Sequence, residues 1–357
     1  MSWYLITRRK MAPRKAPDGA DPASAGTHSA DTHEDAPARP PYRNAAVVLA
    51  IAIGMGAIFA TSYSLFLGRA TPHHITIGLV GSPAGHAALL VALRRSTHGG
   101  LAFLRYGTVA GVRQAIDQQV SFAALTLGQG SPHLLVSSAS GASVAQLLER
   151  TAEQITQTTG QHVIVVDLHP LPPSDPQGLV SFYVTLASSI VGFVTMFQLR
   201  ANAPGLGLRA WLGSIAVLAV AGGLVLALVA DPLIGALHGP FPELWLALTA
   251  EITVAALFCS TMLTLVHRWA IIPTWLLFVV LGNTSSGGAV ASPLLPSAYA
   301  FIGRFLPPGV TVSIIRTAVY FTHYQHPEPF IVQAVWFACT LAALLISVRV
   351  LRRGPWQ

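Results

Sequence analysis

Six long apolar runs constrain this chain more than any other feature of its sequence. They lie at Ala45–Leu67, Leu179–Leu199, Ala210–Ala230, Leu244–His267, Ala270–Leu281 and Phe330–Val350. A helix needs about 20 apolar residues to cross a bilayer, and only 10% of the residues are charged, against about 25% in soluble domains. The runs therefore predict an α-helical polytopic membrane protein with six spans. The fifth run is shortened by Pro273 and Gly282, so an alternative is that it enters the membrane without crossing it.

The placement of arginine and lysine predicts the orientation of these spans. Cytoplasmic loops of membrane proteins carry an excess of both residues. With six spans, the basic residues of the N-terminal tail, of the turns after spans two and four and of the C-terminus all fall on one side. We therefore expect a protein of the cell (inner or cytoplasmic) membrane with both termini in the cytoplasm. The net charge of +7 reflects this topology, and we expect no nucleic-acid partner, because the basic residues do not cluster with aromatic ones.

The N-terminal tail, residues 1–44, is predicted to be a disordered cytoplasmic segment, because it is rich in Pro, Ala, Asp, Thr and His and has almost no apolar periodicity. The run that follows, residues 45–67, is too long for the apolar part of a signal peptide. It predicts an uncleaved first transmembrane helix. Both cysteines, Cys259 and Cys339, lie inside predicted spans, so no disulfide framework is expected.

Between the first two spans, residues 68–178 alternate between strand-like and helix-like patterns. The strand-like stretches are 75–80, 101–106, 122–127, 133–138 and 162–168, and the helix-like stretches are 85–95, 108–118 and 142–158. Thr108 is the expected N-cap of the second helix. Strands that alternate with helices predict a small external or periplasmic α/β domain with a largely parallel sheet. A Pro-rich tether, Pro170–Gly178, leads from it into a five-helix membrane domain, residues 179–353.

The segment 282–321 lies between two apolar runs but differs from both in composition. Its glycines, serines and paired prolines disfavour a plain spanning helix, yet it is too apolar for an ordinary water-exposed loop. Backbone that leaves helical geometry at membrane depth is tolerated only where protein or a water-filled cavity covers it. The segment therefore predicts a re-entrant or interfacial element before the last span. Within it, apolar residues at helical spacing in Val310–Phe321 indicate an interfacial helix, with Arg304 and Arg316 as its polar members.

The order of tail, first span, external α/β domain, Asp175-Pro176-Gln177-Gly178 tether and clustered C-terminal spans resembles the phage-infection-protein (YhgE/Pip) family. The family's segment after its penultimate span is similar to Gly282-Asn283-Thr284-Ser285-Ser286-Gly287-Gly288-Ala289, Leu294-Leu295-Pro296, Leu306-Pro307-Pro308-Gly309 and Arg316–Phe321. The resemblance covers residues 45–352. It implies a relationship to the membrane subunits of type-2 ABC exporters, and with it a separate cytoplasmic ATPase partner.

The candidate substrate or gating residues come from this segment and from one acidic position. The segment supplies small side chains, exposed carbonyls and hydroxyls that could meet a polar headgroup or a peptide: Gly282, Asn283, Ser285, Ser286, Gly287 and Gly288. The simpler reading is that the glycines let the chain turn sharply. Arg316 fits either a lipid phosphate or, as the favoured alternative, a snorkelling surface arginine.

Glu251 is the acidic position, because it lies inside the fourth predicted span, where a carboxylate is expensive. Its functional reading is proton coupling or substrate contact. The rival reading, which we favour, is a structural hydrogen bond to Ser or Thr on a neighbouring helix, or contact with water outside the membrane.

No catalytic motif or cofactor site is expected. The chain has no P-loop, no Gly-x-Ser-x-Gly elbow, no His-Glu-x-x-His helix and no Cys-x-x-Cys pair, so it is not predicted to be an enzyme. Its histidines are scattered, and the pairs His73-His74 and His323/His326 would need further ligands to hold a metal.

Two functions from different classes remain after these exclusions. The favoured one is a permease subunit of an ABC-2-like exporter that moves a lipid-like, drug-like or peptide substrate outward, as a homodimer or heterodimer among membrane lipids. The alternative is a non-transporting envelope scaffold or secretion-accessory protein whose external domain binds a partner. The weighting rests on analogy between folds.

Overall fold

The computed structural model of the chain describes residues 42–68 and 71–357. The tail expected to be disordered, residues 1–44, lies outside the described residues except for its last three, which begin helix α1 (Tyr42–Phe66). The chain divides into two compact units, Met1–Leu49 and Ala50–Gln357. The contacts described below lie within the second unit.

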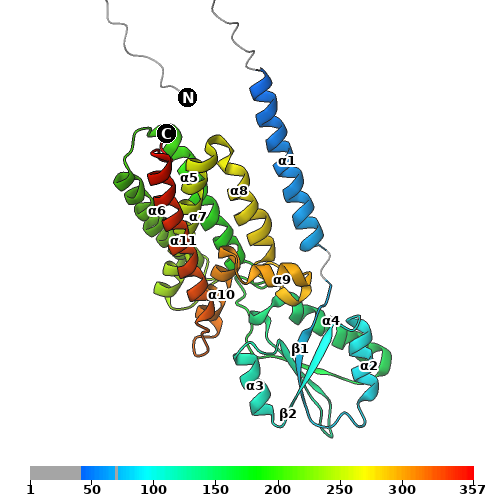
Figure 1. The fold of residues 1–357 in the computed structure, drawn as a ribbon. Helices are drawn as coiled ribbons and strands as arrows, with labels where there is room; N and C mark the ends of the chain where they lie inside the picture. Colours follow the sequence, from blue (N-terminus) through cyan, green and yellow to red (C-terminus); the bar gives the residue numbers. More distant parts are fainter. Residues whose placement is uncertain (1–41, 69–70) are drawn as a thin grey trace, which may run out of the picture. The chain divides into compact units, whose positions relative to one another are not determined.

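A five-stranded sheet forms the centre of the α/β domain (Figure 1). Its strands are β1 (Ile75–Val80), β2 (Leu101–Tyr106), β3 (Ala123–Thr126), β4 (His133–Val136) and β5 (Ile164–Asp167). They lie in the order β2-β1-β3-β4-β5, and every neighbouring pair is parallel except β3 and β4. These two strands are antiparallel because only a short turn joins them, whereas a parallel pair needs a long crossover. The predicted strands and the largely parallel sheet are confirmed.

Three helices cover the two faces of this sheet. On one face, Leu89 and Leu93 of α2 (Ala87–Ser96) and Leu148 of α4 (Ala142–Thr159) pack in one buried cluster with strand residues. On the other face, Val112 and Ile116 of α3 (Val109–Asp117) pack on Ala124 and Leu135. The predicted cap is confirmed: the Thr108 hydroxyl accepts a hydrogen bond of 3.0 Å from the Gly111 amide.

The described residues contain five helical stretches that are long and apolar enough to cross a membrane. The first two are Ala45–Phe66, which lies in α1, and Val180–Asn202, which is α5. The third, Leu208–Leu233, consists of α6 (Leu208–Leu228) and a π-helical turn. The last two are Phe241–Asn283, which is α7 with its continuation, and Glu328–Leu351, which is α11. The count rises to six if the bent pair α9 (Ser297–Gly303) and α10 (Pro307–Tyr320) is taken as one span.

The predicted fourth and fifth spans fall in a single 43-residue stretch, Phe241–Asn283. His267 has a positive φ of 53° at the end of α7 (Phe241–Val266). The chain folds back there through a short 3-10 turn into α8 (Ile271–Trp275) and a π-helix (Leu276–Asn283). The rings of Phe258 and Phe278, on the two arms, are therefore in contact, with centroids 5.7 Å apart.

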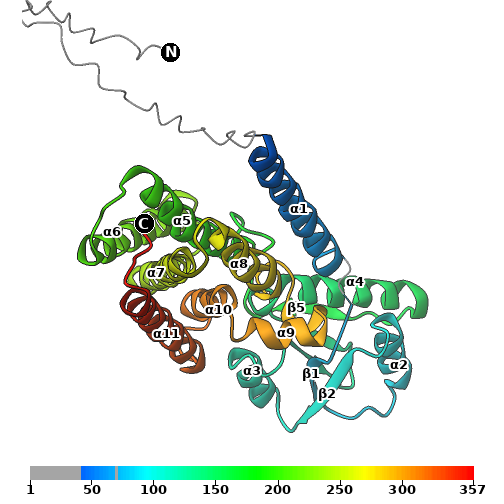
Figure 2. The same ribbon diagram turned by 45° about the horizontal axis from the view of Figure 1, so that its top comes forward.

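The predicted re-entrant or interfacial segment contains a sharp bend. Helices α9 and α10 meet at an angle of 74°, and the prolines at the start of α10 explain the break, because they lack the amide hydrogen that would continue α9. The expectation of an interfacial helix over Val310–Phe321 is not met, because α10 is buried along nearly its whole length. An interfacial helix would expose a polar face, but α10 packs against α5 (Val180–Asn202), α7 and α11 (Glu328–Leu351). Figure 2 shows α10 beside α7 and α11.

Candidate functional site

The glycine–serine segment, residues 282–288, starts within the last two residues of the π-helix and is buried as far as Gly287. The hydroxyls of Thr284, Ser285 and Ser286 each donate to a backbone carbonyl three or four residues earlier. These bonds satisfy carbonyls that the end of a helix leaves without partners. The Asn283 amide donates to the Tyr63 hydroxyl at 2.9 Å, while its own side-chain oxygen is buried without a partner.

The glycines of this region allow backbones to approach one another closely. A Cβ added to Gly303 would lie 1.9 Å from the Ser285 carbonyl oxygen, and one added to Gly309 would lie 2.0 Å from the Gly303 carbonyl oxygen. Gly287 has a φ of +73°, a conformation that residues with a side chain rarely adopt. The positive φ of Gly287 agrees with the simpler interpretation of the segment, that its glycines let the chain turn sharply.

The chain that follows the glycine–serine segment is held by the α/β domain. The Thr71 amide donates to the Leu294 carbonyl at 3.1 Å, and the His73 amide donates to the Pro293 carbonyl at 2.7 Å. Leu294 and Leu295 are buried in the same cluster as the sheet. Irregular backbone between apolar helices is thus covered by protein.

Arg316 lies on α10 and points toward the glycine–serine segment. Its guanidinium donates a hydrogen bond of 2.6 Å to the Gly287 carbonyl oxygen, and the residue is half-buried. The favoured expectation of a snorkelling surface arginine is therefore wrong. The structure brings Arg316 into contact with the segment that contains six other predicted site residues: Gly282, Asn283, Ser285, Ser286, Gly287 and Gly288.

Glu251 is the predicted site residue that lies apart from this group. It is fully buried on α7, and its two carboxylate oxygens accept hydrogen bonds from Ser189 of α5 at 2.6 Å and from Thr311 of α10 at 2.9 Å. The Gln333 amide of α11 is close to the carboxylate but makes no hydrogen bond of ordinary geometry. This geometry is the one that the favoured structural reading of Glu251 predicts, since both donors are hydroxyls of neighbouring helices.

A polar pocket of about 280 Å³ lies beside Arg316. We call it the Arg304–Arg316 pocket; the residues that matter for its chemistry are Gln119, Ser313, Arg304, Arg316, His326 and Glu328. Sequence reasoning placed Arg304 on an interfacial helix and did not identify Gln119 at all. No local pattern marks Gln119, because it comes from the end of α3, far from the other residues in sequence.

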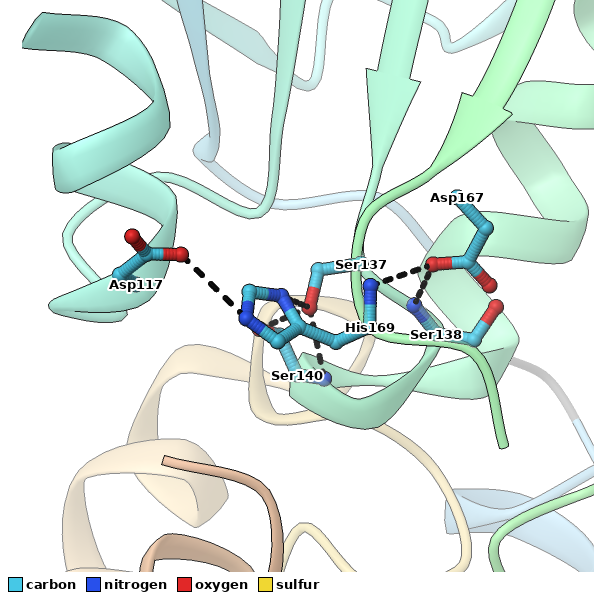
Figure 3. Close-up of polar contacts among 6 residues, drawn as sticks. All are labelled: Asp117, Ser137, Ser138, Ser140, Asp167 and His169. Carbon is cyan, nitrogen blue, oxygen red and sulfur yellow. Dashed lines mark hydrogen bonds and ion pairs between the residues drawn. The ribbon is translucent and has the colours of Figure 1, made fainter. Parts of the chain in front are cut away.

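A second polar cluster lies at the ends of strands β4 and β5 (Figure 3). The Ser137 hydroxyl is 3.4 Å from His169 Nδ1, and His169 Nε2 is 3.3 Å from a carboxylate oxygen of Asp117. Asp167 accepts hydrogen bonds from the amides of Ser138 and His169. The first three side chains are of the types that form a nucleophilic triad.

The surroundings of Ser137 favour a structural role for this cluster. Ser137 is 1% exposed, and its hydroxyl lies 2.8 Å from the hydroxyl of Ser140 and also accepts that residue's amide hydrogen. A nucleophile has to reach its substrate, whereas this hydroxyl is enclosed and caps a turn. The cluster fixes the ends of β4 and β5 to α3. Elsewhere in the described ranges, no group of three or more His, Cys, Asp and Glu is placed to hold a metal ion.

Comparison of the chain with family models, with curated proteins and with solved structures finds no match. The fold itself defines a class: a small α/β sheet domain joined to five helices, or six with the bent pair, that are long and apolar enough to cross a membrane.

Proposed function

We propose that this chain is an integral membrane permease subunit of an ABC-2-like exporter, which moves a lipid-like, drug-like or peptide substrate outward with a separate ATPase. The observation that most supports this proposal is the enclosed break in the helical region. Residues 286–287, 290–291 and 295 lie outside helix but are buried. Broken helices covered by protein are typical of transport proteins, where irregular backbone lines a pathway.

A lateral groove supports a lipid-like or drug-like substrate. It lies between α7 and α11 and has a volume of about 490 Å³. Its walls are mostly apolar, with Leu246, Ala250, Phe330 and Phe337 among them, and Glu243 and Gln333 supply polar groups. A mostly apolar site of this size with few polar groups is the usual form of a small-molecule site.

The position of the groove next to Glu251 gives the permease a candidate gating element. Gln333 lines the groove and is close to the Glu251 carboxylate, which in turn binds α5 and α10. A substrate that displaces Gln333 would therefore change the surroundings of a carboxylate that joins α5, α7 and α10. We propose Glu251 and Gln333 as the residues that link substrate entry to helix movement.

The permease proposal also includes the orientation of the chain in the membrane and its protein partners. With both termini in the cytoplasm, the α5–α6 turn and the α7–α8 hairpin face the cytoplasm, and an ATPase would bind there through Arg200, Arg209 and Arg268. Residues 68–178 would lie outside. One bundle of this size encloses little of a pathway, so we propose a homodimer or a heterodimer.

Purification in mild detergent tests the proposal. We expect a nucleotide hydrolase to be recovered with the chain, and the double variant Arg209→Glu, Arg268→Glu to lose it because the charge of the contact is reversed. The matched control, Arg94→Glu, Arg105→Glu in the α/β domain, should retain it. Recovery of the chain without any hydrolase from the cells that produce it naturally would contradict the permease proposal.

One observation favours the alternative, a scaffold whose external domain binds a partner. β5 is an edge strand, and its residues Ile164, Val165 and Val166 are each exposed by more than a third of their surface. An exposed apolar edge is a template for an added strand. If this alternative holds, Val165→Lys should abolish crosslinking of the full chain to its partner, while Arg150→Lys on the nearby helix should not.

A further inference from the structure

The Arg304–Arg316 pocket carries positive charge that the protein itself does not neutralise. Among the described residues, the one ion pair within 4.0 Å joins His169 and Asp117. Arg304 and Arg316 therefore lack a carboxylate partner, although Glu328 lines the same pocket. With histidine neutral, two positive groups and one negative group leave the pocket with a net charge of +1. A half-buried guanidinium without a counter-ion is costly.

Several hydrogen-bond donors of this pocket are also unused. Arg316 gives one hydrogen bond to the Gly287 carbonyl, but a guanidinium has five N–H groups. The side-chain nitrogen of Gln119 is buried and has no partner. Residues Gly309 and Val310, from the first turn of α10, line the pocket as well, and the start of a helix attracts anions. Donors from three separate elements thus meet around one space.

The exposed surface next to the pocket is apolar. Phe301, Ile302 and Phe305 flank Arg304 on α9 and its end, and they are 62%, 42% and 43% exposed. The rings of Phe301 and Phe305 lie 5.3 Å apart. An arginine among exposed aromatic and aliphatic side chains is the arrangement that meets a lipid, with its charge at the headgroup and its neighbours in the acyl region.

We propose that the Arg304–Arg316 pocket binds the phosphate group of an anionic membrane lipid. The phosphate oxygens accept hydrogen bonds from Arg304, Arg316 and Gln119, and the acyl chains lie along Phe301, Ile302 and Phe305. Guanidinium and phosphate match in geometry as well as in charge. A volume of about 280 Å³ is at the lower limit for ligand sites, so it suits a headgroup and excludes a whole lipid.

The proposed phosphate would contact both the α/β domain and the α9–α10 region, so its binding would also strengthen the contact between them. Gln119 belongs to the α/β domain, whereas Arg304 directly follows α9 and Arg316 lies on α10. His326, before α11, is also bonded to this domain, with its Nε2 3.1 Å from the Gln118 carbonyl oxygen. A bound phosphate adds further bonds across the same contact.

Native mass spectrometry of the full chain in detergent tests this proposal without any transport assay, so it can fail while the permease proposal stands. The probes are dioleoyl phosphatidic acid, dioleoylglycerol, which has the same chains without the phosphate, and inorganic phosphate. We expect phosphatidic acid to bind and dioleoylglycerol not to. Removal of a charged donor in Arg304→Gln or Arg316→Gln should weaken binding by roughly tenfold, and Gln119→Ala by roughly threefold.

Controls separate this result from loss of folding. Arg268→Gln, in the α7–α8 turn, should leave binding unchanged. Arg316 also holds Gly287, but the Arg304 side chain makes no such bond and the Gln119 nitrogen has no partner, so their variants test the site without removing an internal contact. Equal binding of phosphatidic acid to all variants, or equal binding of dioleoylglycerol, would overturn the proposal. If inorganic phosphate bound as tightly as phosphatidic acid and through the same arginines, the pocket would be a site for free phosphate, and the proposal of a lipid ligand would be wrong.

Discussion

Glu251 shows how a carboxylate is accommodated among apolar helices. It is 0% exposed, and a buried charged or polar group is tolerated when hydrogen bonds replace those it made to water. Ser189 and Thr311 supply these bonds from two different helices. The side chain therefore holds α5, α7 and α10 in one arrangement, whether or not it also takes part in transport.

Substitution of Glu251 should lower stability in proportion to the bonds that are lost. Glu251→Leu removes both acceptors, and we expect a loss of about 1–3 kcal/mol in the free energy of unfolding. The buried Thr311 hydroxyl loses its acceptor, and Ser189 keeps only the longer bond of 3.2 Å to the Thr185 carbonyl. Glu251→Gln keeps one acceptor and should cost less. Thermal unfolding in detergent measures both, with Glu153→Gln, at an exposed position of α4, as the control. A variant Glu251→Leu as stable as the parent would show that the hydrogen bonds contribute nothing.

Glu149 on α4 gives a pH-dependent prediction in the α/β domain. Burial raises the pKa of Glu149 above its usual range, and the nearby carboxylates of Asp167 and Glu153 raise it further. The folded state therefore binds this proton more tightly than the unfolded state. Stability from this group is present in acid and is lost as pH rises through the raised pKa.

Glu149→Gln should remove the loss of stability that the parent shows as pH rises, because glutamine does not titrate. The variant should match the parent near pH 4 and exceed it in thermal midpoint at neutral pH. Thermal unfolding of both proteins at the two pH values measures the difference. A parent that gains stability relative to the variant as pH rises would contradict the assigned direction.

At the scale of elements, the break between α9 and α10 depends on glycine as much as on proline. The prolines stop the helix, but the close passage of Gly303 and Gly309 lets the bent pair pack against the glycine–serine segment. No other residue type fits where a Cβ would lie about 2 Å from a backbone oxygen.

Gly303→Ala should therefore displace the bend and destabilise the chain by more than about 1 kcal/mol, since the clash is with backbone. Gly213→Ala is the matched control, because it lies in α6 with no atom within 4 Å of the added carbon. Alanine there should be neutral or stabilising by about 1 kcal/mol, the usual difference in helix propensity. Thermal unfolding of the two variants measures the difference. A lower midpoint for Gly303→Ala alone supports close packing at Gly303, whereas equal losses in both variants would contradict it.

Sequence patterns predicted the elements of the α/β domain well, because strand and helix periodicities are local. They also placed the break in segment 282–321 from its prolines and glycines. They could not tell whether α10 is interfacial or buried, since an apolar stripe on one face does not reveal whether the other faces are covered by α5, α7 and α11. The pocket beside Arg316 was beyond reach for the same reason: Gln119 and Arg304 meet only through tertiary contacts.

At the scale of the molecule, the loop after the glycine–serine segment joins the α/β domain to the helical region. Val290, Ala291, Leu294 and Leu295 contribute to the core of a domain whose other buried members come from residues 75–163. The α/β domain is therefore completed by a segment more than a hundred residues away in sequence.

Leu295→Ala should destabilise the α/β domain by about 2–4 kcal/mol, the usual cost of a cavity in a core. Limited proteolysis should cut residues 71–177 faster in this variant than in the parent. Leu281→Ala, at a position that is 38% exposed, is the control and should leave the rate unchanged. Equal rates for both variants would mean that the sheet domain does not depend on this loop.

Labelling in intact cells tests most directly whether the helices cross the membrane and place the α/β domain outside. In a background with Cys259→Ala and Cys339→Ala, single cysteines are placed by Gln157→Cys on α4 and by Arg353→Cys near the C-terminus. We predict that a membrane-impermeant maleimide labels the first in intact cells and the second only after permeabilisation. Labelling of the C-terminal position alone in intact cells, or release of the chain from membranes at alkaline pH, would contradict the account.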